Sequence, residues 1–240
     1  MKSGRSPPRS AHYQLLPLYH LNTTSPHKDF TLYSTKPSPS GWKVAVIMEE
    51  LGLNYDTIWI PVLVDHLNAD FVIWDSSAIM LYLIERYDKE GKITVQSAAE
   101  KAVMMQWLFY QSSSQGPMFS QLFYFGWRLP ERMPTAIKRY QDELIRIFAV
   151  LEGVLKKAKE DGKDWLVGDK LTVVDLSFVI WNHFAPFLMS TYERTFAISQ
   201  DYPHVFAWHK RMTERPGVKR ILEQHAEYND SFAALSAMWK

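Results

Sequence analysis

The hydrophobic pattern of residues 30–87 alternates between strand-like and helix-like segments. The strand-like stretches "FTLYST" and "NYDTIWI" flank "SGWKVAVIMEELG", whose apolar residues recur at helical spacing and which ends at Gly52. This order predicts a βαβ unit, with Ser40 as the candidate cap of its helix. "PVLVDH" and "FVIWD", joined by the short polar "LNAD", predict a hairpin, and "SSAIMLYLIERYD" predicts a largely buried helix.

From residue 97 onward the pattern is helical throughout. "AAEKAVMMQWLFYQSSSQGPMFSQLFYFGW" is rich in aromatic residues and is expected to end or kink at Gly116-Pro117, because proline lacks a backbone N–H. "PTAIKRYQDELIRIFAVLEGVLKKAKEDG" is an ordinary amphipathic helix. In "DKLTVVDLSF", Thr172 and Asp175 form a capping pair ahead of an apolar helix, so we assign both residues to folding.

The stretch "NYDTIWIPVLVDH", residues 54–66, holds two strand patterns with no turn between them. Its β-branched and aromatic residues form a nearly unbroken run, whereas paired strands need a connection with Gly, Asn, Asp or Pro chemistry. A connecting segment is therefore missing here.

Composition narrows the range of functions. The 240 residues are 47% hydrophobic with only 10 glycines, which suits a compact chain of one or two domains. The net charge of +1 gives no overall field for nucleic acid, so no nucleic-acid partner is expected. The absence of cysteine excludes disulfides, Cys-ligated metals and protein thiolate nucleophiles, and the eight histidines show no metal spacing. No apolar run is long enough to span a membrane, so a soluble protein is predicted.

Residues 1–28 are basic, free of acidic residues and interrupted by prolines. This composition predicts a disordered tail. A mitochondrial presequence is the alternative, but the prolines break the amphipathic helix that such a signal uses. The expected location is therefore cytoplasmic, with mitochondria as the alternative.

Five segments together resemble the glutathione transferase superfamily, and within it the fungal nitrogen-regulator branch. They are "SPSGWKVAVIMEELGLNYDTI", "PVLVDH", "FVIWDSSAIMLYLIERYD", "QWLFYQSSSQGPMFSQ" and "WLVGDKLTVVDLSF", and the match covers residues 30–220. The implied fold class is an α+β thioredoxin-like N-terminal domain, truncated by the loss of its second helix, plus an all-helical C-terminal domain. The implied boundaries are a tail at 1–28, a glutathione-binding domain at 29–92, a helical domain at 97–225 and a C-terminal tail at 226–240.

The resemblance also explains the missing connection. Relatives carry a loop, a helix and a turn between the second strand and the strand that Pro61 leads. In this fold the first strand lies between those two strands, so the link must cross about 10 Å. A few extended residues reach that far only by unravelling part of "DTIWI". A strained or disordered edge is expected at this point.

By the same resemblance, glutathione lies extended along the first domain. Ile60 would pair with its cysteinyl backbone, and Pro61 would supply a cis peptide bond. Asp75 would pair with the γ-glutamyl ammonium, while the hydroxyl and N–H of Ser76 would hold the carboxylate at a helix N-terminus. The alternative is that Asp75 and Ser76 only cap the helix.

The catalytic group must stabilise the glutathione thiolate, which is the nucleophile. The resembled branch has an asparagine where Ser40 stands, so the Ser40 hydroxyl is the first candidate donor and Ser38 the second. The alternative is that Ser40 only caps its helix and that both serines are loop residues. No cofactor is expected, because glutathione acts as a co-substrate.

The second substrate would enter between the domains. Candidates to line its site are Phe119, Phe123, Tyr124 and Trp181, with core packing as the alternative role for each. The expected partners are glutathione and a small electrophile, and the resemblance implies a homodimer.

Three functions remain open from the sequence. The first is a glutathione transferase that conjugates electrophiles or reduces peroxides. The second is a non-catalytic regulatory binding protein of the same fold. The third is an inactive product that lacks the segment before Pro61.

Overall fold

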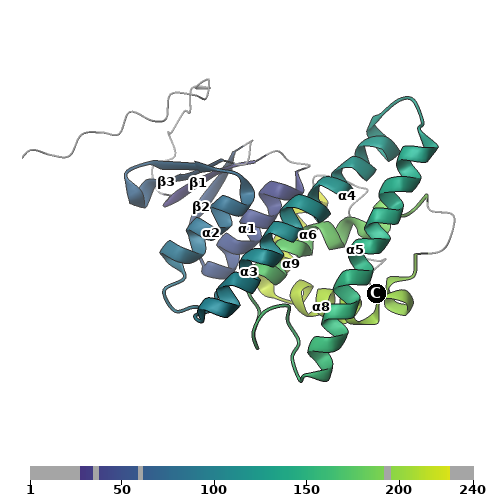
Figure 1. Ribbon diagram of the computed structural model, residues 1–240. Coiled ribbons are helices and arrows are strands. Elements are labelled where there is room, and N and C mark those ends of the chain that lie inside the picture. Colours follow the sequence, from purple (N-terminus) through teal and green to yellow (C-terminus); the bar gives the residue numbers. More distant parts are fainter. Residues whose placement is uncertain (1–27, 35–37, 59–61, 192–195, 228–240) are drawn as a thin grey trace, which may run out of the picture.

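The computed structural model describes residues 28–34, 38–58, 62–191 and 196–227 (Figure 1). The expected basic tail lies outside the described residues, apart from Lys28. The first part of the fold comprises β1 (Phe30–Tyr33), α1 (Pro39–Leu51), β2 (Tyr55–Ile58), β3 (Val62–Asp65), a 3-10 turn (His66–Asn68), β4 (Phe71–Trp74) and α2 (Ser76–Tyr87). The second part comprises α3 (Ala98–Tyr110), α4 (Gly116–Phe123), α5 (Pro134–Glu160), α6 (Val173–Leu188), α7 (Ile198–Asp201), α8 (Pro203–Thr213) and α9 (Pro216–Glu227).

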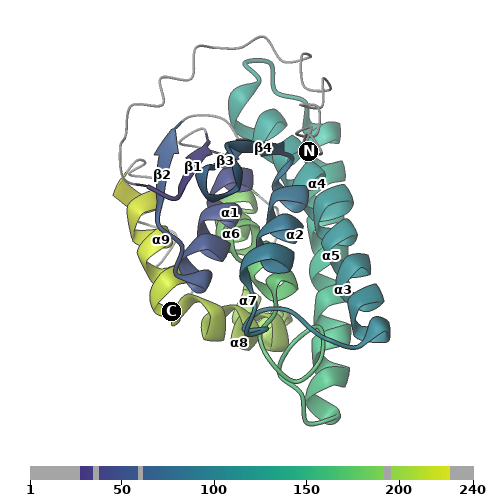
Figure 2. The same ribbon diagram turned by 90° about the vertical axis from the view of Figure 1, so that its left-hand side faces the viewer.

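The four strands form one mixed sheet in the order β2-β1-β3-β4. β1 and β2 are parallel, with Phe30 opposite Tyr55, and β3 runs antiparallel to both β1 and β4. α1 and α2 pack against each other on one side of the sheet (Figure 2), and α1 packs against α6 of the helical part. The predicted fold class, a thioredoxin-like domain joined to an all-helical domain, is confirmed.

The link between β2 and β3 is as short as the sequence implies. β2 ends at Ile58 and β3 begins at Val62, although β1 lies between them in the sheet. Two strand spacings of about 4.8 Å separate β2 from β3. Three extended residues span about 10 Å, so the chain reaches β3 without room for a helix. The strain or disorder expected at this edge falls on residues 59–61, which lie outside the described residues.

The start of α1 corrects one sequence-based expectation. Ser40 was expected to cap this helix, but the cap is Ser38, in extended conformation, and Ser40 is already helical. The reason is Pro39, whose fixed φ and missing N–H favour the first helical position. The C-terminal stop is as predicted, because Gly52 takes the left-handed conformation with φ of 67°.

The aromatic-rich helix was expected to end or kink at Gly116-Pro117. It instead continues past this point with one wider turn. One turn of π-helix, Gln111–Gln115, connects α3 to α4 and is called the π-turn below. The Gly116 N–H donates to the Gln111 carbonyl. Pro117 lies in the first turn of α4, where its missing N–H is tolerated. A second π-turn, Tyr124–Arg128, follows α4. The π-turn buries two polar side chains, Gln111 and Gln115, in the interior.

The predicted capping pair at the start of α6 is confirmed and is fully buried. Asp175 accepts hydrogen bonds from the Thr172 N–H at 2.8 Å and from the Thr172 hydroxyl at 3.0 Å. It also accepts from the Leu166 N–H and from the Trp208 indole N–H, each at 3.0 Å. Burial raises the pKa of this carboxyl, although the hydrogen bonds oppose the shift. Asp175 thus joins α6, α8 and the loop before α6.

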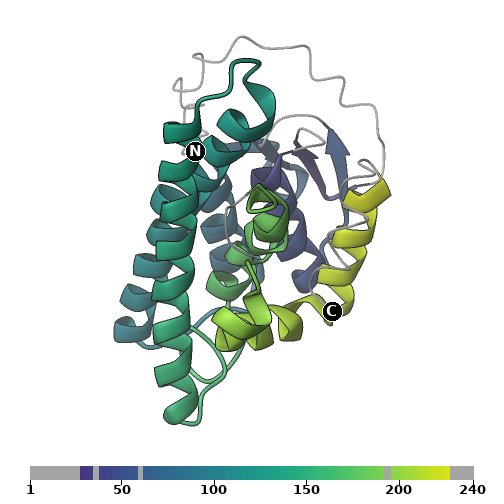
Figure 3. The same ribbon diagram turned by 90° about the vertical axis from the view of Figure 1, so that its right-hand side faces the viewer.

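α9 returns from the helical part to the first domain and lies beside α1 (Figure 3). The Arg215 guanidinium donates through Nε to both oxygens of the Glu50 carboxylate, at 2.9 and 3.0 Å. The Glu50 side chain is only 6% exposed, and Arg215 satisfies both of its carboxylate oxygens. Arg220 pairs with the neighbouring Glu49. α9 therefore fixes the two parts of the chain against each other at the C-terminal end of α1.

Candidate functional site

The N-terminus of α2 is formed by an acid in a strained conformation. Asp75 is the cap, and its Oδ1 accepts from the Ser77 N–H at 2.9 Å and from the Ala78 N–H at 3.0 Å. Its φ of 70° lies in the region that favours glycine, which costs an aspartate of order 1–3 kcal/mol. Strain of this kind is retained mainly at functional positions. Because Asp75 is exposed and both bonds use Oδ1, Oδ2 is available to a ligand.

Two serines follow Asp75 in the first turn of α2, and both are 8% exposed. Among the described residues, the buried Ser77 hydroxyl has no hydrogen-bond partner. Ser76 is the first residue of the helix, where unpaired backbone N–H groups and the positive end of the dipole favour an anion. Asp75 and Ser76 are thus adjacent at one helix end, with an acceptor for a cation beside donors for an anion.

The candidate donors to the thiolate lie at the N-terminus of α1. Ser38 is the helix cap and Ser40 is in the first turn, and both are partly exposed. Within the described part of the chain, neither hydroxyl makes a hydrogen bond to protein. Gly41 packs so closely on Ser34, next to β1, that a Cβ at position 41 would lie 1.5 Å from the Ser34 hydroxyl oxygen. This close approach fixes the start of α1 against the sheet.

The other two predicted glutathione contacts cannot be placed. Ile60 and Pro61 lie outside the described residues, so the backbone pairing and the cis bond stay predictions. The described chain resumes at Val62, in the central part of the sheet.

A buried lysine beside this site was not predicted. Lys43 of α1 is 3% exposed, and its Nζ donates to the Gln111 Oε1 at 2.8 Å. Burial lowers the pKa of Lys43 to about 8, and the negative charge of Asp75 opposes this shift. The sequence did contain a signal, because Lys43 precedes Ile47 by four residues and so lies on the buried face of the helix.

The four aromatic candidates divide into buried and accessible pairs. Phe119 is fully buried and contacts Phe148 and Trp181 at ring distances of 6.4 and 6.1 Å. Trp181 is 7% exposed, so both side chains belong to the core. Phe123 is partly exposed, and Tyr124 is 46% exposed. Only Phe123 and Tyr124 therefore present appreciable surface to a substrate.

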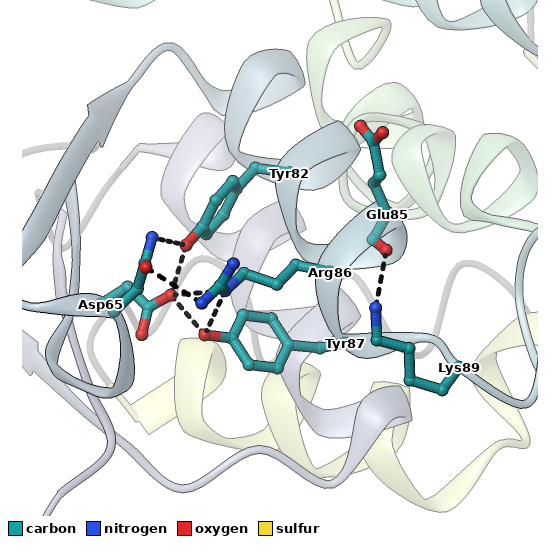
Figure 4. A network of polar contacts seen from close by, with 7 residues as sticks. Asp65, Tyr82, Glu85, Arg86, Tyr87 and Lys89 are labelled. Carbon is teal, nitrogen blue, oxygen red and sulfur yellow. Dashed lines mark hydrogen bonds and ion pairs between the residues drawn. The ribbon is translucent and has the colours of Figure 1, made fainter.

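The opposite end of α2 is anchored to the sheet by a polar cluster (Figure 4). The fully buried Asp65 of β3 accepts hydrogen bonds from the hydroxyls of Tyr82 and Tyr87. The Arg86 Nε lies 3.7 Å from the same carboxylate oxygen, and Arg86 also donates to Asn68 at 2.9 Å. Burial raises the pKa of both tyrosines, so they remain donors. These contacts fix the second half of α2 to β3 and to the 3-10 turn after it.

Two further properties concern the described residues only. They contain no group of His, Asp and Glu side chains arranged to hold a metal ion. Nor do they include a helix that is long and apolar enough to cross a lipid bilayer.

Comparisons with known proteins place these features in a family context. Residues 99–216 match the family model described as glutathione S-transferase, C-terminal domain. Glutathione S-transferase 2 of Schizosaccharomyces pombe is 34% identical over 227 residues, covering 82% of this chain and 96% of that protein. Protein URE2 of Candida albicans is 32% identical over 248 residues, covering 82% of this chain and 70% of that protein.

Solved structures agree in fold as well as in sequence. Ure2p5 from Phanerochaete chrysosporium, cocrystallized with 1-(S-glutathionyl)-2,4-dinitrobenzene, superposes with a TM-score of 0.80 at 42% identity. The superposition covers 85% of this chain and 97% of that chain. Ure2p in complex with glutathione superposes with a TM-score of 0.75 at 32% identity, covering 82% of this chain and 95% of that chain.

Proposed function

Because the chain belongs to the glutathione S-transferase superfamily, in the Ure2-type branch, we propose that it binds glutathione and joins the glutathionyl group, through its sulfur, to small electrophiles. One observation carries the proposal, namely the strained Asp75 next to Ser76 at the N-terminus of α2. The Oδ2 of Asp75 accepts the γ-glutamyl ammonium, and the Ser76 hydroxyl and N–H hold the carboxylate. An amino-acid head group carries both charges and therefore suits this helix end.

The reacting sulfur lies near the N-terminus of α1 in this proposal. The Ser40 hydroxyl, or that of Ser38, donates a hydrogen bond to the thiolate, and the positive end of the helix dipole adds to its stabilisation. The sulfur electron pair forms a bond to an electrophilic carbon, and the leaving group departs with its bonding pair. With a peroxide, the sulfur takes one oxygen as the O–O bond breaks, and the departing alkoxide takes up a proton. Glutathione is the co-substrate, and no further cofactor enters.

The remaining assignments complete the proposed site. Ile60 pairs with the cysteinyl backbone, and Pro61 supplies the cis bond. Phe123 and Tyr124 contact the electrophile, whereas the buried Phe119 and Trp181 belong to the core.

We also propose that the chain forms a homodimer. Among the described residues, the most exposed large apolar side chains are Trp74 at 64% and Phe109 at 59%. Exposed apolar side chains of this size favour a protein contact when they form a patch. The cytoplasmic location expected from the sequence stays a prediction.

Two observations favour other functions. Similarity to URE2 proteins favours a regulatory binding protein that keeps the fold and the peptide site without turnover. The short link between β2 and β3 favours an inactive product, because the absent segment would otherwise flank the site. Each alternative makes a distinct prediction for the experiment below.

The test is calorimetric titration of glutathione into the purified chain, with the molar mass measured by light scattering on the same sample. Binding with a millimolar or lower Kd by a folded dimer supports the proposal. Transfer to 1-chloro-2,4-dinitrobenzene then measures turnover, and Ser40→Ala and Ser38→Ala identify the donor by a raised thiol pKa. Binding without turnover would indicate the regulatory protein. A folded chain that does not bind glutathione would overturn the proposal.

A further inference from the structure

Lys43 holds a positive charge inside the protein without an acid in contact with it. Its side chain is 3% exposed, and its one hydrogen-bond acceptor is the neutral Gln111 amide. Among the described residues, no carboxylate lies within ion-pair distance of its Nζ. Lysine is rarely buried unless it is paired. A buried ammonium in this situation attracts any anion that binds nearby, because the interior screens charge poorly.

The charge of Lys43 faces the proposed glutathione site. α1, which carries Lys43, packs against α2, which begins at Ser76. β1 and β4 both run antiparallel to β3, so α1 and α2, which follow these strands, begin at the same edge of the sheet. The negative charge of Asp75, the cap of α2, favours the charged form of Lys43. Lys43 therefore lies in the protein interior near the N-terminus of α2, where Asp75 is exposed to solvent.

The helical domain holds this lysine in place through a row of buried amides. Gln111 donates to the Gln115 Oε1 at 3.3 Å, and Gln115 donates to the Asn182 Oδ1 of α6 at 2.8 Å. All three amide side chains are fully buried, and the two glutamines belong to the π-turn. Buried networks of this kind restrict their members to one arrangement. The row therefore connects the helical domain to the first domain at Lys43.

We propose that Lys43 is a specificity-determining residue that selects ligands with a free γ-glutamyl carboxylate. This inference rests on the proposed function, since it assigns the source of the positive charge at the same site. Asp75 attracts the ammonium of the ligand, and Lys43 together with the α2 N-terminus attracts the carboxylate. Gln111 acts as a positioning residue, because it holds the Lys43 ammonium without neutralising it. A ligand that lacks the carboxylate gains nothing from Lys43.

The test compares two ligands on four proteins by calorimetry at pH 7. The ligands are glutathione and its analogue with the γ-glutamyl carboxylate converted to an amide. The proteins are the wild type, Lys43→Met, Lys43→Arg and Gln111→Glu, each checked by circular dichroism. Lys43→Met removes the charge, Gln111→Glu neutralises it while keeping the lysine, and Lys43→Arg retains it.

We expect Lys43→Met and Gln111→Glu to raise the glutathione Kd about tenfold, an effect typical of one charge at short range. The Kd of the amide analogue should change less than about twofold, and Lys43→Arg should keep most of the glutathione affinity. If Lys43→Met fails to fold, Gln111→Glu decides the question alone. Equal losses for both ligands, or no loss for glutathione, would overturn the role of Lys43 and leave the proposed function intact. A folded wild-type chain that binds no glutathione would overturn both.

Discussion

Two helices of this protein have an aspartate that accepts hydrogen bonds at their N-terminus, Asp75 as the cap of α2 and Asp175 in the first turn of α6, and the two aspartates differ in almost every physical respect. At the start of α6, Asp175 is fully buried and accepts four hydrogen bonds, which use both of its oxygens. At the start of α2, Asp75 is exposed and accepts two bonds, both on Oδ1. Asp75 also has a positive φ of 70°, which burial and hydrogen bonding alone do not require. Both oxygens of Asp175 accept hydrogen bonds, whereas the Asp75 Oδ2 accepts none from the described residues.

An aspartate that only stabilises a helix start can be told from one that could also bind a ligand. Both residues belong to the acid and hydroxyl residues that mark the start of an apolar helix, Asp75 at the cap and Asp175 three residues after the cap Thr172. What separates them is the number of lone pairs that the protein itself fills and the strain that the backbone retains. A saturated, relaxed cap serves folding, whereas a strained cap with a free oxygen is a candidate for function.

The largest expected effect is on stability at α6. Asp175→Ala leaves three donors of the chain and the Trp208 indole buried without their acceptor, so we expect a loss of about 4 kcal/mol in unfolding free energy. Asp75→Ala removes an exposed cap and should cost only about 1 kcal/mol. Urea unfolding of both variants at pH 7 measures the difference. Equal losses would show that the two caps have the same role.

Two buried histidines, His183 of α6 and His209 of α8, predict that the folded protein is less stable in acid. Burial lowers the pKa of His183 to about 4, and that of the adjacent His209 lies well below its usual value because of burial and of His183. The unfolded chain takes up these protons near pH 6.5, whereas the folded chain does not. Unfolding free energy should therefore fall as the pH decreases from about 6.5 to 4, by about 3 kcal/mol from His183 alone.

Urea unfolding at several pH values between 7 and 4.5 measures this slope. His183→Asn is the matched variant, because it removes one titrating group and should flatten the curve. A wild-type curve that is level over this range would contradict the burial of a neutral His183.

Much of the fold follows from local patterns in the sequence. The βαβ unit, the hairpin and the capping pair at Thr172 and Asp175 were predicted because each depends on residues close in sequence. The prediction of Ser40 as the cap was wrong for a local reason as well. Pro39 takes the first helical position, so the cap is Ser38. The widened turn at Gln111–Gln115 was foreseen only as a break, because a π-turn and a helix end share the same proline signal.

The electrostatics of the site could not be predicted in the same way. Lys43 and Gln111 belong to different domains and are far apart in sequence, so their contact depends on how the domains pack. The free oxygen of Asp75 likewise depends on the backbone conformation that the fold imposes on it. Helical spacing indicates that Lys43 is buried, but a pairing across a domain boundary leaves no periodic signal, so the partner Gln111 could not be predicted.

Replacing Asp75 by asparagine separates the capping role of this residue from a role in ligand binding. Asp75→Asn keeps an oxygen that can accept from the Ser77 and Ala78 N–H groups, and asparagine tolerates a positive φ, so unfolding free energy should change by less than about 0.5 kcal/mol. The charge that pairs with the ligand ammonium is lost, so the glutathione Kd should rise about tenfold. Calorimetry and urea unfolding on the same preparation measure both quantities. An unchanged Kd would show that the Asp75 side chain serves only to cap α2.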